Sequence, residues 1–459
     1  MGRAAGAPQT RGMTSLKRLL GDQLLSPGHR GWDSELAGFN TAAAHRPDLV
    51  VAAEHADQIA TTVRYAAERG LPVGVQATGH GISVPVDGGI LISTGRLRGV
   101  DIDPEARTAR VEAGVRWNQV IAAAAPYGLA PLNGSSPFVG VVGYTLGGGL
   151  GPMARQFGYA ADHVRWIDVV TADGVPRRAG ADEEPDLFWA MRGGKGNFGV
   201  VTAMEFGLMP VRIFYGGGLF FAAESVEAVL DTWWQWTAEL PESMTTSLAL
   251  LRLPDLPTVP APLRGRVSAH VRITFLGVPA DGNRLLAPLR GLGPILDTVV
   301  ERSYPEIGEV HQDPVDPMPL QERSILLDSF DVHAAKTLLE VAGPGSGCSA
   351  YIVELRHLGG AVARLPEVPS ATGHRDTAFT LATIAPPDGV SASVLTALEP
   401  WGSGGAYINF LNGPGAEKQT ARAFAPAVYQ RLAELKRRYD PANLFRFNQN
   451  IPPIDSRSS

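Results

Sequence analysis

The 459-residue sequence contains a single cysteine, Cys348, and ten histidines that are scattered along the chain. One cysteine cannot form an intramolecular disulfide, so a disulfide-stabilised scaffold is excluded. No histidine stands in metal-ligand spacing with Cys, Asp or Glu, so we expect no metal centre. We expect Cys348 to be a small buried hydrophobic residue. Redox chemistry in this chain therefore requires an organic cofactor.

An excess of positive charge and long apolar runs are also missing. The 40 Lys and Arg residues against 46 Asp and Glu residues give a net charge of −6, which argues against nucleic acid as the main partner. No apolar run reaches the about 18 residues that a membrane span needs, so we expect no membrane partner. Residues 1–20 lack the apolar stretch of an export signal, and Met13 is an alternative start. These features predict a cytoplasmic protein.

Glycine and proline, by contrast, are abundant, with 53 and 36 residues. This composition predicts many turns at which the backbone closely approaches a ligand. The glycine-dense block 134–151 is not a flexible linker, because bulky apolar residues such as Phe138, Val141 and Leu146 are threaded through it. We expect this block to form ordered backbone around a bound molecule.

The hydrophobic patterns predict an α+β chain. We expect strands at residues 46–51, 71–76, 89–93, 100–103, 108–112, 164–172 and 199–208, and helices at 54–69 and 116–127. The pattern changes after Pro210, and a second domain is expected from about Tyr215, with strands near 266–275, 349–355 and 378–384 and a helix at 331–339. A final helix is expected at 421–439, with Val428, Leu432 and Leu435 on one face.

A G-x-G-x-x-G motif spans Gly194 to Gly199, but it does not predict a Rossmann dinucleotide site. That site needs a helix N-terminus directly after the glycines, whereas the pattern of residues 200–206 predicts a strand. Close approach of this glycine loop to a cofactor remains an expectation. The sequence has no Walker loop, no His-Glu-x-x-His and no G-x-S-x-G motif.

His80 differs from the other histidines by its surroundings, Gln76-Ala-Thr-Gly-His80-Gly-Ile82, which directly follow a predicted strand. Small residues on both sides allow backbone N–H groups to converge on an anion such as a pyrophosphate, with the imidazole at the same surface. His80 is therefore a candidate functional residue. A surface or satisfied core histidine is the alternative.

Several motifs occur in a fixed order and together carry a resemblance. They are Ala77-Thr-Gly-His80-Gly81, Gly134-Ser-Ser-Pro-Phe-Val-Gly140, Gly143-Tyr-Thr-Leu-Gly-Gly-Gly-Leu-Gly151, Val169-Val-Thr-Ala-Asp-Gly174, Tyr407-Ile-Asn-Phe410 and Asp440-Pro-Ala-Asn-Leu-Phe-Arg446. With this ordered set, residues 46–453 resemble the berberine bridge enzyme-like flavoproteins of the vanillyl-alcohol oxidase / p-cresol methylhydroxylase (PCMH) superfamily.

The resemblance implies an α+β fold with two main parts. A PCMH-type FAD-binding domain of two α+β subdomains is expected at residues 41–213, after a partly disordered extension at 1–40. A substrate domain with an antiparallel sheet covered by helices is expected at 214–415. The C-terminal segment 416–459 is expected to return to the FAD domain.

The resemblance also implies an FAD cofactor bonded covalently to His80, since a neutral imidazole is a competent nucleophile. Many members add a second link through a cysteine, but Ser136 stands there, so we expect a single link. Val139 matches a position that faces the flavin edge where dioxygen reacts, and a valine there resembles the oxidases. The implied FAD-binding residues are Gln76, Ala77, Thr78, Gly79, His80, Gly81, Gly134, Ser135, Ser136, Val139, Gly140, Gly143, Tyr144, Gly148, Gly149, Gly199, Val200, Asn448 and Asn450.

The catalytic base is not fixed by the resemblance, because two positions that supply it in relatives hold Phe410 and Ala382. The remaining candidates lie on the strand that contains Ile352, Glu354 and Arg356, whose side chains share one face by period-two geometry. By resemblance, this face lines the active site. Glu354 is either a base with a raised pKa or a structural carboxylate that is kept ionised by Arg356.

Other side chains are further candidates around the site. Tyr144 and Tyr407 are the phenolic alternatives to Glu354, and Asn409 is a candidate for orienting the substrate. Trp233, Trp234 and Trp236 line either an aromatic pocket or, as such clusters more often do, the core.

The resemblance implies an oxidase in specialised metabolism. It would transfer hydride from an alcohol, a sugar or a polyketide-type metabolite to flavin N5 and return the electrons to dioxygen, giving hydrogen peroxide. One alternative is a flavin-dependent oxygenase or cyclase, which Phe410 in the base position favours. Another is a flavin-containing resistance protein that only binds a drug or metabolite. The sequence leaves the substrate and the oligomeric state open.

Overall fold

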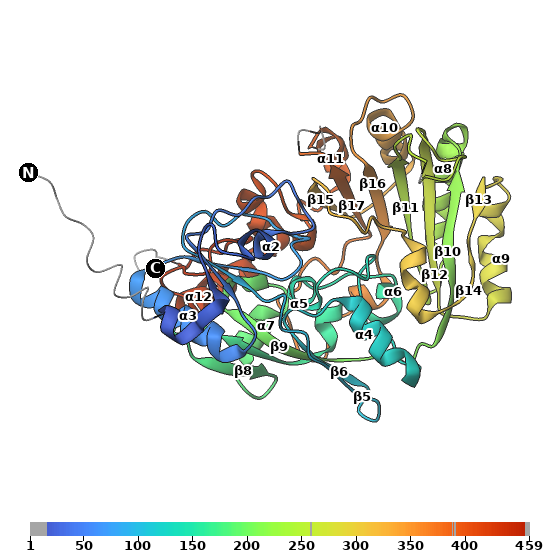
Figure 1. Cartoon of the computed structure of the whole chain (residues 1–459). Helices are drawn as coiled ribbons and strands as arrows, with labels where there is room; N and C mark the ends of the chain where they lie inside the picture. Colours follow the sequence, from blue (N-terminus) through green and yellow to red (C-terminus); the bar gives the residue numbers. More distant parts are fainter. Residues whose placement is uncertain (1–15, 258, 388, 390–391, 455–459) are drawn as a thin grey trace, which may run out of the picture.

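The computed structural model describes residues 16–257, 259–387, 389 and 392–454. Residues 1–15 of the expected N-terminal extension, Met13 among them, lie outside these residues, whereas residues 16–40 are described and include ordered helical turns. The described chain forms two lobes (Figure 1), one built on two sheets and the other on a single large sheet. This arrangement confirms the expected mixed helix-and-sheet fold with two main parts.

The first lobe contains two sheets, with strand orders β1-β2-β4-β3 and β5-β6-β9-β7-β8. In the smaller sheet β2, β4 and β3 are parallel and β1 pairs antiparallel with β2, whereas the pairs of the larger sheet are all antiparallel. The strands are β1 (Leu24–Leu25), β2 (Leu49–Ala52), β3 (Val73–Gln76), β4 (Ile90–Ser93), β5 (Val100–Asp103), β6 (Thr108–Glu112), β7 (Val164–Val170), β8 (Pro176–Gly180) and β9 (Val200–Gly207).

Helix α3 (Ala56–Arg69) joins the two sheets of this lobe. It connects the parallel strands β2 and β3, and it also contacts β7 and β9 of the other sheet. Its buried side chains Ile59, Val63 and Ala66 recur at helical spacing, as the sequence predicts. The other α-helices of this lobe are α2 (Trp32–Leu36), α4 (Trp117–Ala124), α5 (Val141–Thr145), α6 (Ala154–Phe157) and α7 (Pro185–Met191).

The second lobe is an eight-stranded antiparallel sheet, with the order β13-β10-β12-β11-β16-β17-β15 and with β14 also paired to β10. Its strands are β10 (Ile213–Phe221), β11 (Met244–Arg252), β12 (Val267–Phe275), β13 (Leu296–Asp297), β14 (Val300–Ser303), β15 (Gln321–Leu327), β16 (Ile352–His357) and β17 (Phe379–Ala385). The strand expected from residue 349 thus begins at Ile352.

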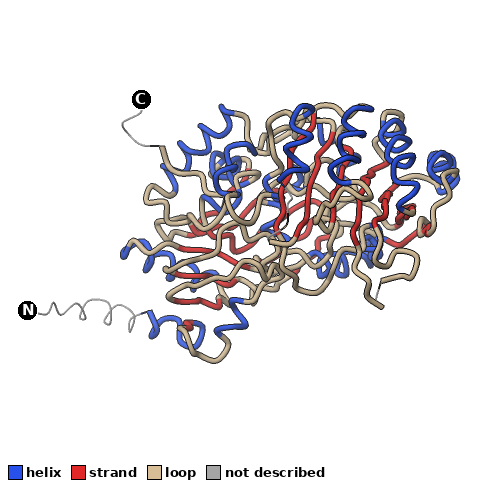
Figure 2. Tube along the Cα trace, turned by 90° about the horizontal axis from the view of Figure 1, so that it is seen from above, coloured by secondary structure: helices blue, strands red, loops and turns tan. Residues whose placement is uncertain are grey.

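Four helices cover one face of this sheet (Figure 2): α8 (Val226–Thr237), α9 (Pro279–Arg290), α10 (Val332–Ala342) and α11 (Ala392–Leu398). Their apolar side chains form one core with Val353 and Leu355 of β16. Trp233 and Trp236 are buried in this core and Trp234 packs against it, which agrees with the core interpretation of the three tryptophans. Cys348 packs against the same core as expected of a small hydrophobic residue, but it is only partly buried.

The chain ends on the first lobe. Helix α12 (Pro426–Tyr439) contacts α7, and Val73 at the start of β3 donates a backbone hydrogen bond of 2.9 Å to Leu444. The helix expected from Ala421 begins only at Pro426, because residues 416–423 form a separate 3₁₀ helix. Proline is favoured at the first helical position, where its missing N–H has no cost.

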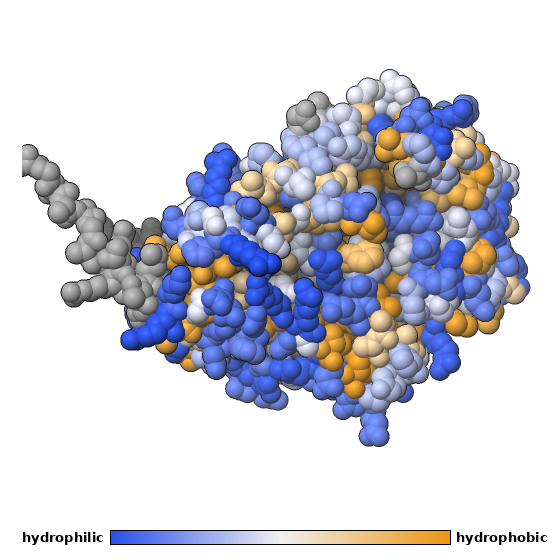
Figure 3. All heavy atoms as spheres, viewed as in Figure 1, coloured by the Kyte–Doolittle hydropathy of each residue, from blue (hydrophilic) through white to orange (hydrophobic). Residues whose placement is uncertain are grey.

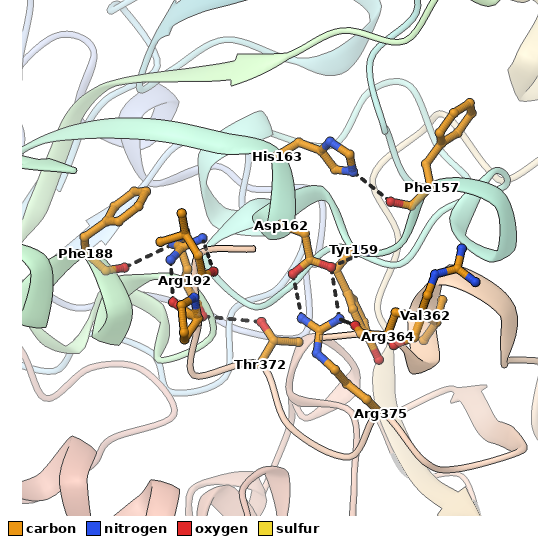
Figure 4. Close-up of polar contacts among 12 residues, drawn as sticks. Phe157, Tyr159, Asp162, His163, Phe188, Arg192, Val362, Arg364, Thr372 and Arg375 are labelled. Carbon is orange, nitrogen blue, oxygen red and sulfur yellow. Dashed lines mark hydrogen bonds and ion pairs between the residues drawn. The ribbon is translucent and has the colours of Figure 1, made fainter. Parts of the chain in front are cut away.

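Buried polar contacts hold a loop of the second lobe against the first (Figure 4). Arg375 donates to both carboxylate oxygens of Asp162, at 2.5 and 3.0 Å, and also to the backbone oxygen of Arg364. Arg192 donates to the backbone oxygens of Val368 and Pro369 in the same loop. Because these charged groups are nearly buried and paired, they fix how the loop between β16 and β17 sits on the first lobe.

The face in Figure 3 is mainly hydrophilic, and its apolar residues lie in small separate groups. Among the described residues, no helix has both the length and the apolar character to cross a membrane.

Candidate active site

A cavity of about 710 Å³ lies between the two lobes. The loops that follow β3, the block 134–144 and the start of β9 form one wall. Strands β11, β12, β15 and β16 and the segment 407–410 form the other. Residues of the motifs at 77–81, 134–140 and 407–410, which are far apart in the sequence, therefore meet at one site.

Glycines shape the first wall of the cavity. A Cβ atom on Gly81 or Gly143 would meet nothing within 4 Å, so the backbone there borders open space. Gly79 has a φ of +66°, and a Cβ on it would lie 2.5 Å from the Cα of Gly38. Such a turn of bare backbone can approach a ligand at a distance that side chains would prevent.

Several buried polar atoms around the cavity have no hydrogen-bond partner. On the first-lobe wall they include Nε2 of His80, the hydroxyl of Tyr144 and Oδ1 of Asn448, and all three residues line the cavity. Buried polar atoms are nearly always paired in native proteins. Three unpaired atoms around one cavity, together with the bare glycine backbone, fit a large polar cofactor.

The His80 ring lies at the end of this cradle. It stacks on Phe39 with a centroid distance of 4.1 Å, and its Nδ1 is 2.9 Å from the Thr78 hydroxyl. Burial, assisted by the charge of Arg116, lowers the pKa of His80 to about 4. The imidazole is therefore neutral at neutral pH, which is the nucleophilic form.

The comparisons with known proteins identify the cofactor. The FAD binding domain family model matches residues 47–180, and the berberine and berberine-like model matches residues 406–452. The chain is 30% identical over 465 residues to (R)-6-hydroxynicotine oxidase of Paenarthrobacter nicotinovorans, covering 95% of this chain and 97% of the relative. This chain belongs to the berberine bridge enzyme-like family of FAD-linked oxidoreductases.

Solved structures agree with this membership. The crystal structure of 6-hydroxy-D-nicotine oxidase from Arthrobacter nicotinovorans matches with a TM-score of 0.80 and 28% identity, over 94% of this chain and 98% of that one. Xylooligosaccharide oxidase from Myceliophthora thermophila, in complex with xylobiose, matches in fold with a TM-score of 0.81 and 20% identity, over 97% of this chain and 100% of that one. The predicted family and enzyme class are thus confirmed.

Most of the residues that we expect to bind FAD line the cavity of this FAD-linked oxidoreductase. Gly148, Gly149 and Asn450 do not. Gly148 and Gly149 have left-handed φ values of +98° and +78°, and a Cβ on Gly149 would lie 2.5 Å from the ring of Tyr144. These two glycines therefore allow close packing behind the cavity wall.

Ser136 and Val139 also line the cavity. The Ser136 hydroxyl accepts a hydrogen bond of 3.3 Å from the Phe138 backbone, so it serves a turn. A hydroxyl lacks the nucleophilicity of a thiolate. Val139 presents a small apolar side chain to the cavity.

Glu354 lies on β16 with both carboxylate oxygens occupied. One oxygen accepts hydrogen bonds from Ser247 and Arg272 at 2.7 and 2.6 Å. The other accepts a hydrogen bond of 2.8 Å from Nε of Arg356, whose Nη2 forms an ion pair with the same oxygen at 2.8 Å. Burial opposes ionisation, but Arg356 and Arg272 outweigh it and hold the pKa of Glu354 well below its usual range. Of the two alternatives for Glu354, the geometry favours the structural carboxylate.

Tyr407 and Asn409 form a hydrogen-bonded group beside the cavity. The Tyr407 hydroxyl accepts from the backbone of Leu150 at 2.9 Å and from Nδ2 of Asn409 at 3.0 Å. Burial raises the pKa of Tyr407 to about 12, and it raises that of Tyr144 well above its ordinary value. Both phenols are therefore neutral near pH 7, with their protons in place.

Lys195 and Glu322 are among the ionisable residues of the cavity wall that the sequence did not indicate as site residues. Lys195 donates to Oδ1 of Asn409 at 2.6 Å and to the backbone oxygen of Gly143 at 3.0 Å. It lies inside the G-x-G-x-x-G motif, and its φ of +60° is unusual for a residue with a side chain. The sequence did contain a signal for Lys195 as a site residue, because this lysine lies in a glycine loop that is expected to contact a cofactor. Glu322 lies on β15, for which the sequence gives no site signal.

Proposed function

We propose that this FAD-linked oxidoreductase is an oxidase with its flavin bonded to His80 alone. It would oxidise a small organic metabolite, an alcohol, a sugar or a polyketide-type compound, with dioxygen as acceptor and hydrogen peroxide as product. The observation that supports this most directly is the neutral His80 imidazole, which lies at the cavity and has an unpaired Nε2.

When bound, FAD supplies a hydride acceptor at N5 and the electrons that reduce dioxygen. The chain supplies the remaining functions. His80 provides the nucleophilic nitrogen, and Ser136 leaves the attachment single. Val139 keeps the wall open to a small molecule such as dioxygen. Asn409, held by Lys195, orients the substrate beside Tyr407.

The substrate class is supported by the relatives and by the cavity wall. The names of the relatives refer to a hydroxylated nicotine and to a xylooligosaccharide, both small polar organic molecules. The second wall combines the charged residues Arg356 and Asp313 with the apolar Ile352 and Phe410. Such a surface suits a compound that has both polar groups and a carbon skeleton.

The first test is the absorbance spectrum of the purified protein before and after acid precipitation. We expect the yellow flavin to stay in the pellet and to map to the His80 peptide. His80→Ala is the control, and its flavin should appear in the supernatant. Flavin that stays covalently bound in His80→Ala would move the attachment site to another residue.

The second test is peroxide release with a panel of alcohols, mono- and oligosaccharides, polycyclic polyketides and (R)-6-hydroxynicotine. We expect at least one compound to bleach the flavin without air and to release peroxide in air. A compound that binds tightly without bleaching the flavin would instead support a binding protein.

Phe410 and Ala382 favour one further candidate function, an oxygenase or cyclase. Neither side chain can accept a proton, and both occupy positions from which relatives supply the base. Reaction under labelled dioxygen distinguishes the candidates. Label in the organic product would indicate an oxygenase, whereas label found only in peroxide supports the oxidase.

A further inference from the structure

Glu322 is another carboxylate in the cavity wall, besides Glu354 and Asp313, and its surroundings differ from those of Glu354. Its Oε2 accepts a hydrogen bond from the amide of Asn412. Among the described residues, no hydrogen-bond donor reaches its other oxygen, and no arginine forms an ion pair with it within 4.0 Å. Glu354, by contrast, is saturated by Arg272, Arg356 and Ser247. Glu322 therefore keeps an oxygen free for a ligand in the cavity.

The backbone holds Glu322 beside the segment that contains Phe410. The backbone N–H of Glu322 donates to Oδ1 of Asn412 at 2.7 Å, and the backbone N–H of Asn412 donates to the backbone oxygen of Glu322 at 3.1 Å. Ser324 follows Glu322 by two residues on β15. Its hydroxyl accepts a hydrogen bond of 3.0 Å from the backbone N–H of Tyr407 and donates one of 3.2 Å to the backbone oxygen of Tyr407. The carboxylate is thus attached to the segment 407–412, in which Phe410 replaces a phenol.

Three charged groups from different elements act on Glu322. They are Arg356 on β16, Asp313 in the loop before β15 and Lys195 in the glycine loop of the first lobe. Burial raises the pKa of Glu322 to about 7, although Asn412, Arg356 and Lys195 favour the ionised form. A carboxylate with a pKa close to the working pH can both take up and release a proton.

Five other ionisable groups of the wall are less suited to accept a proton. Glu354 is held ionised by two arginines, and the phenols of Tyr144 and Tyr407 retain their protons. Lys195 donates to two oxygens, and although burial lowers its pKa to about 8, it is still mainly the ammonium near pH 7. Burial lowers the pKa of His311 well below its ordinary value, and this residue lies on the Arg272 side of Glu354.

We propose that Glu322 is the catalytic proton acceptor and that the substrate is oxidised at a carbon that carries a hydroxyl or an amine. This inference rests on the proposed oxidase function. The O–H or N–H bond of the substrate breaks, its electron pair forms the second bond of the new C=O or C=N group, and the proton goes to a carboxylate oxygen of Glu322. The C–H bond breaks at the same carbon, and its hydrogen and two electrons reduce the enzyme-bound flavin.

The first experiment detects the proton directly and needs no substrate. Infrared difference spectra of the flavin-loaded enzyme, titrated from about pH 5 to pH 9, should contain a carboxyl C=O band that disappears with a midpoint near pH 7. Glu322→Gln should remove this band, because glutamine keeps the acceptor for Asn412 and loses the ionisable group. Glu340→Gln, an exposed site on α10, should retain it. A band that persists in Glu322→Gln would overturn the assignment.

The second experiment measures flavin reduction without air, with the compound that bleaches the wild-type enzyme. Glu322→Gln should slow reduction by about 10²-fold or more and remove the fall in rate below pH 7. Glu340→Gln should leave rate and pH profile unchanged. An unchanged profile in Glu322→Gln would contradict the proposal while the oxidase function stands. If the wild-type enzyme released no peroxide, the proposed function itself would fail, and the infrared band would still report on Glu322.

Discussion

The two walls of the cavity differ in what they are made of. The first-lobe wall is mostly backbone and small side chains, with Gly79, Gly81 and Gly143 where a cofactor approaches. The second-lobe wall is charged, with Arg356, Glu354 and other ionisable groups on neighbouring strands. A wall of backbone suits a cofactor whose shape is always the same. A wall of side chains can differ between enzymes that act on different substrates.

The two walls also differ in the source of the unfavourable free energy that the fold must offset. Gly79 in the first wall adopts its left-handed φ at low steric cost but leaves no room for a Cβ. Charges in the second wall must be paired, because an isolated buried charge is strongly unfavourable. We therefore expect mutations in the first wall to affect flavin binding through sterics, and mutations in the second to act through unpaired charge.

The largest expected effect concerns the second wall. Glu354→Gln leaves Arg272 and Arg356 buried without their counterion, and breaking such a buried pair typically costs about 3–5 kcal/mol. Glu242→Gln, which removes an exposed partner of Arg364, should cost at most about 1 kcal/mol. Urea denaturation of both variants measures the contrast. Equal losses of stability would show that the buried arginines do not depend on Glu354.

The next effect tests sterics in the first wall. Gly79→Ala and Gly70→Ala both place a side chain at left-handed φ values, +66° and +63°, which costs about 1 kcal/mol. Only Gly79 adds a clash, with the Cα of Gly38, and overpacking adds about 1–3 kcal/mol. We expect Gly79→Ala to lose flavin, seen as a lower ratio of flavin to protein absorbance, and Gly70→Ala to keep it. Normal flavin content in Gly79→Ala would argue against a rigid cradle.

A smaller effect is expected at Val139. Val139→Ile adds one methylene group at the proposed path of dioxygen. We expect reoxidation of the reduced flavin to slow by about tenfold, which corresponds to about 1.4 kcal/mol in the barrier. Reduction by substrate should be unchanged, because it depends on the second wall. Stopped-flow measurement of the two half-reactions separates them, and a slower reduction step alone would contradict this role.

The smallest effect concerns the protonation of His80. Because its pKa is lowered to about 4, the imidazole is neutral at both pH 6 and pH 8. Covalent attachment of FAD to the apoprotein should therefore proceed at nearly the same rate at the two pH values. A histidine with an ordinary pKa of about 6.5 would react about fourfold more slowly at pH 6. Acid-stable flavin measured over time gives the two rates, and a fourfold difference would mean that His80 is solvated.

The sequence was sufficient to predict most of the secondary structure of the first wall. Helix α3, the strands β2 to β7 and the glycine block followed from local patterns, since residues close in the chain determine them. The motif residues from Gln76 to Gly81 line the cavity as the family resemblance implies. Gly148 and Gly149 show the limit of this reasoning, because they lie outside the cavity lining and pack instead against Tyr159 and Tyr144, respectively.

The second wall could not be assembled from local patterns. Period-two geometry correctly predicts that Glu354 and Arg356 share a face, because alternation within one strand is a local property. Arg272 reaches Glu354 from β12, with β11 between the two strands in the sheet, so their pairing depends on strand order. Strand order is not encoded in any single segment.

By itself, the sequence determined the family. It also predicted, by resemblance, an FAD cradle, His80 as the attachment residue and the lack of a base at Phe410 and Ala382. Only the tertiary structure decided which carboxylate is occupied and which is free. Glu354 and Glu322 are the same residue type on strands of one sheet. Two arginines surround the first and an amide holds the second, because the fold brings distant side chains together and so sets the electrostatic environment of each.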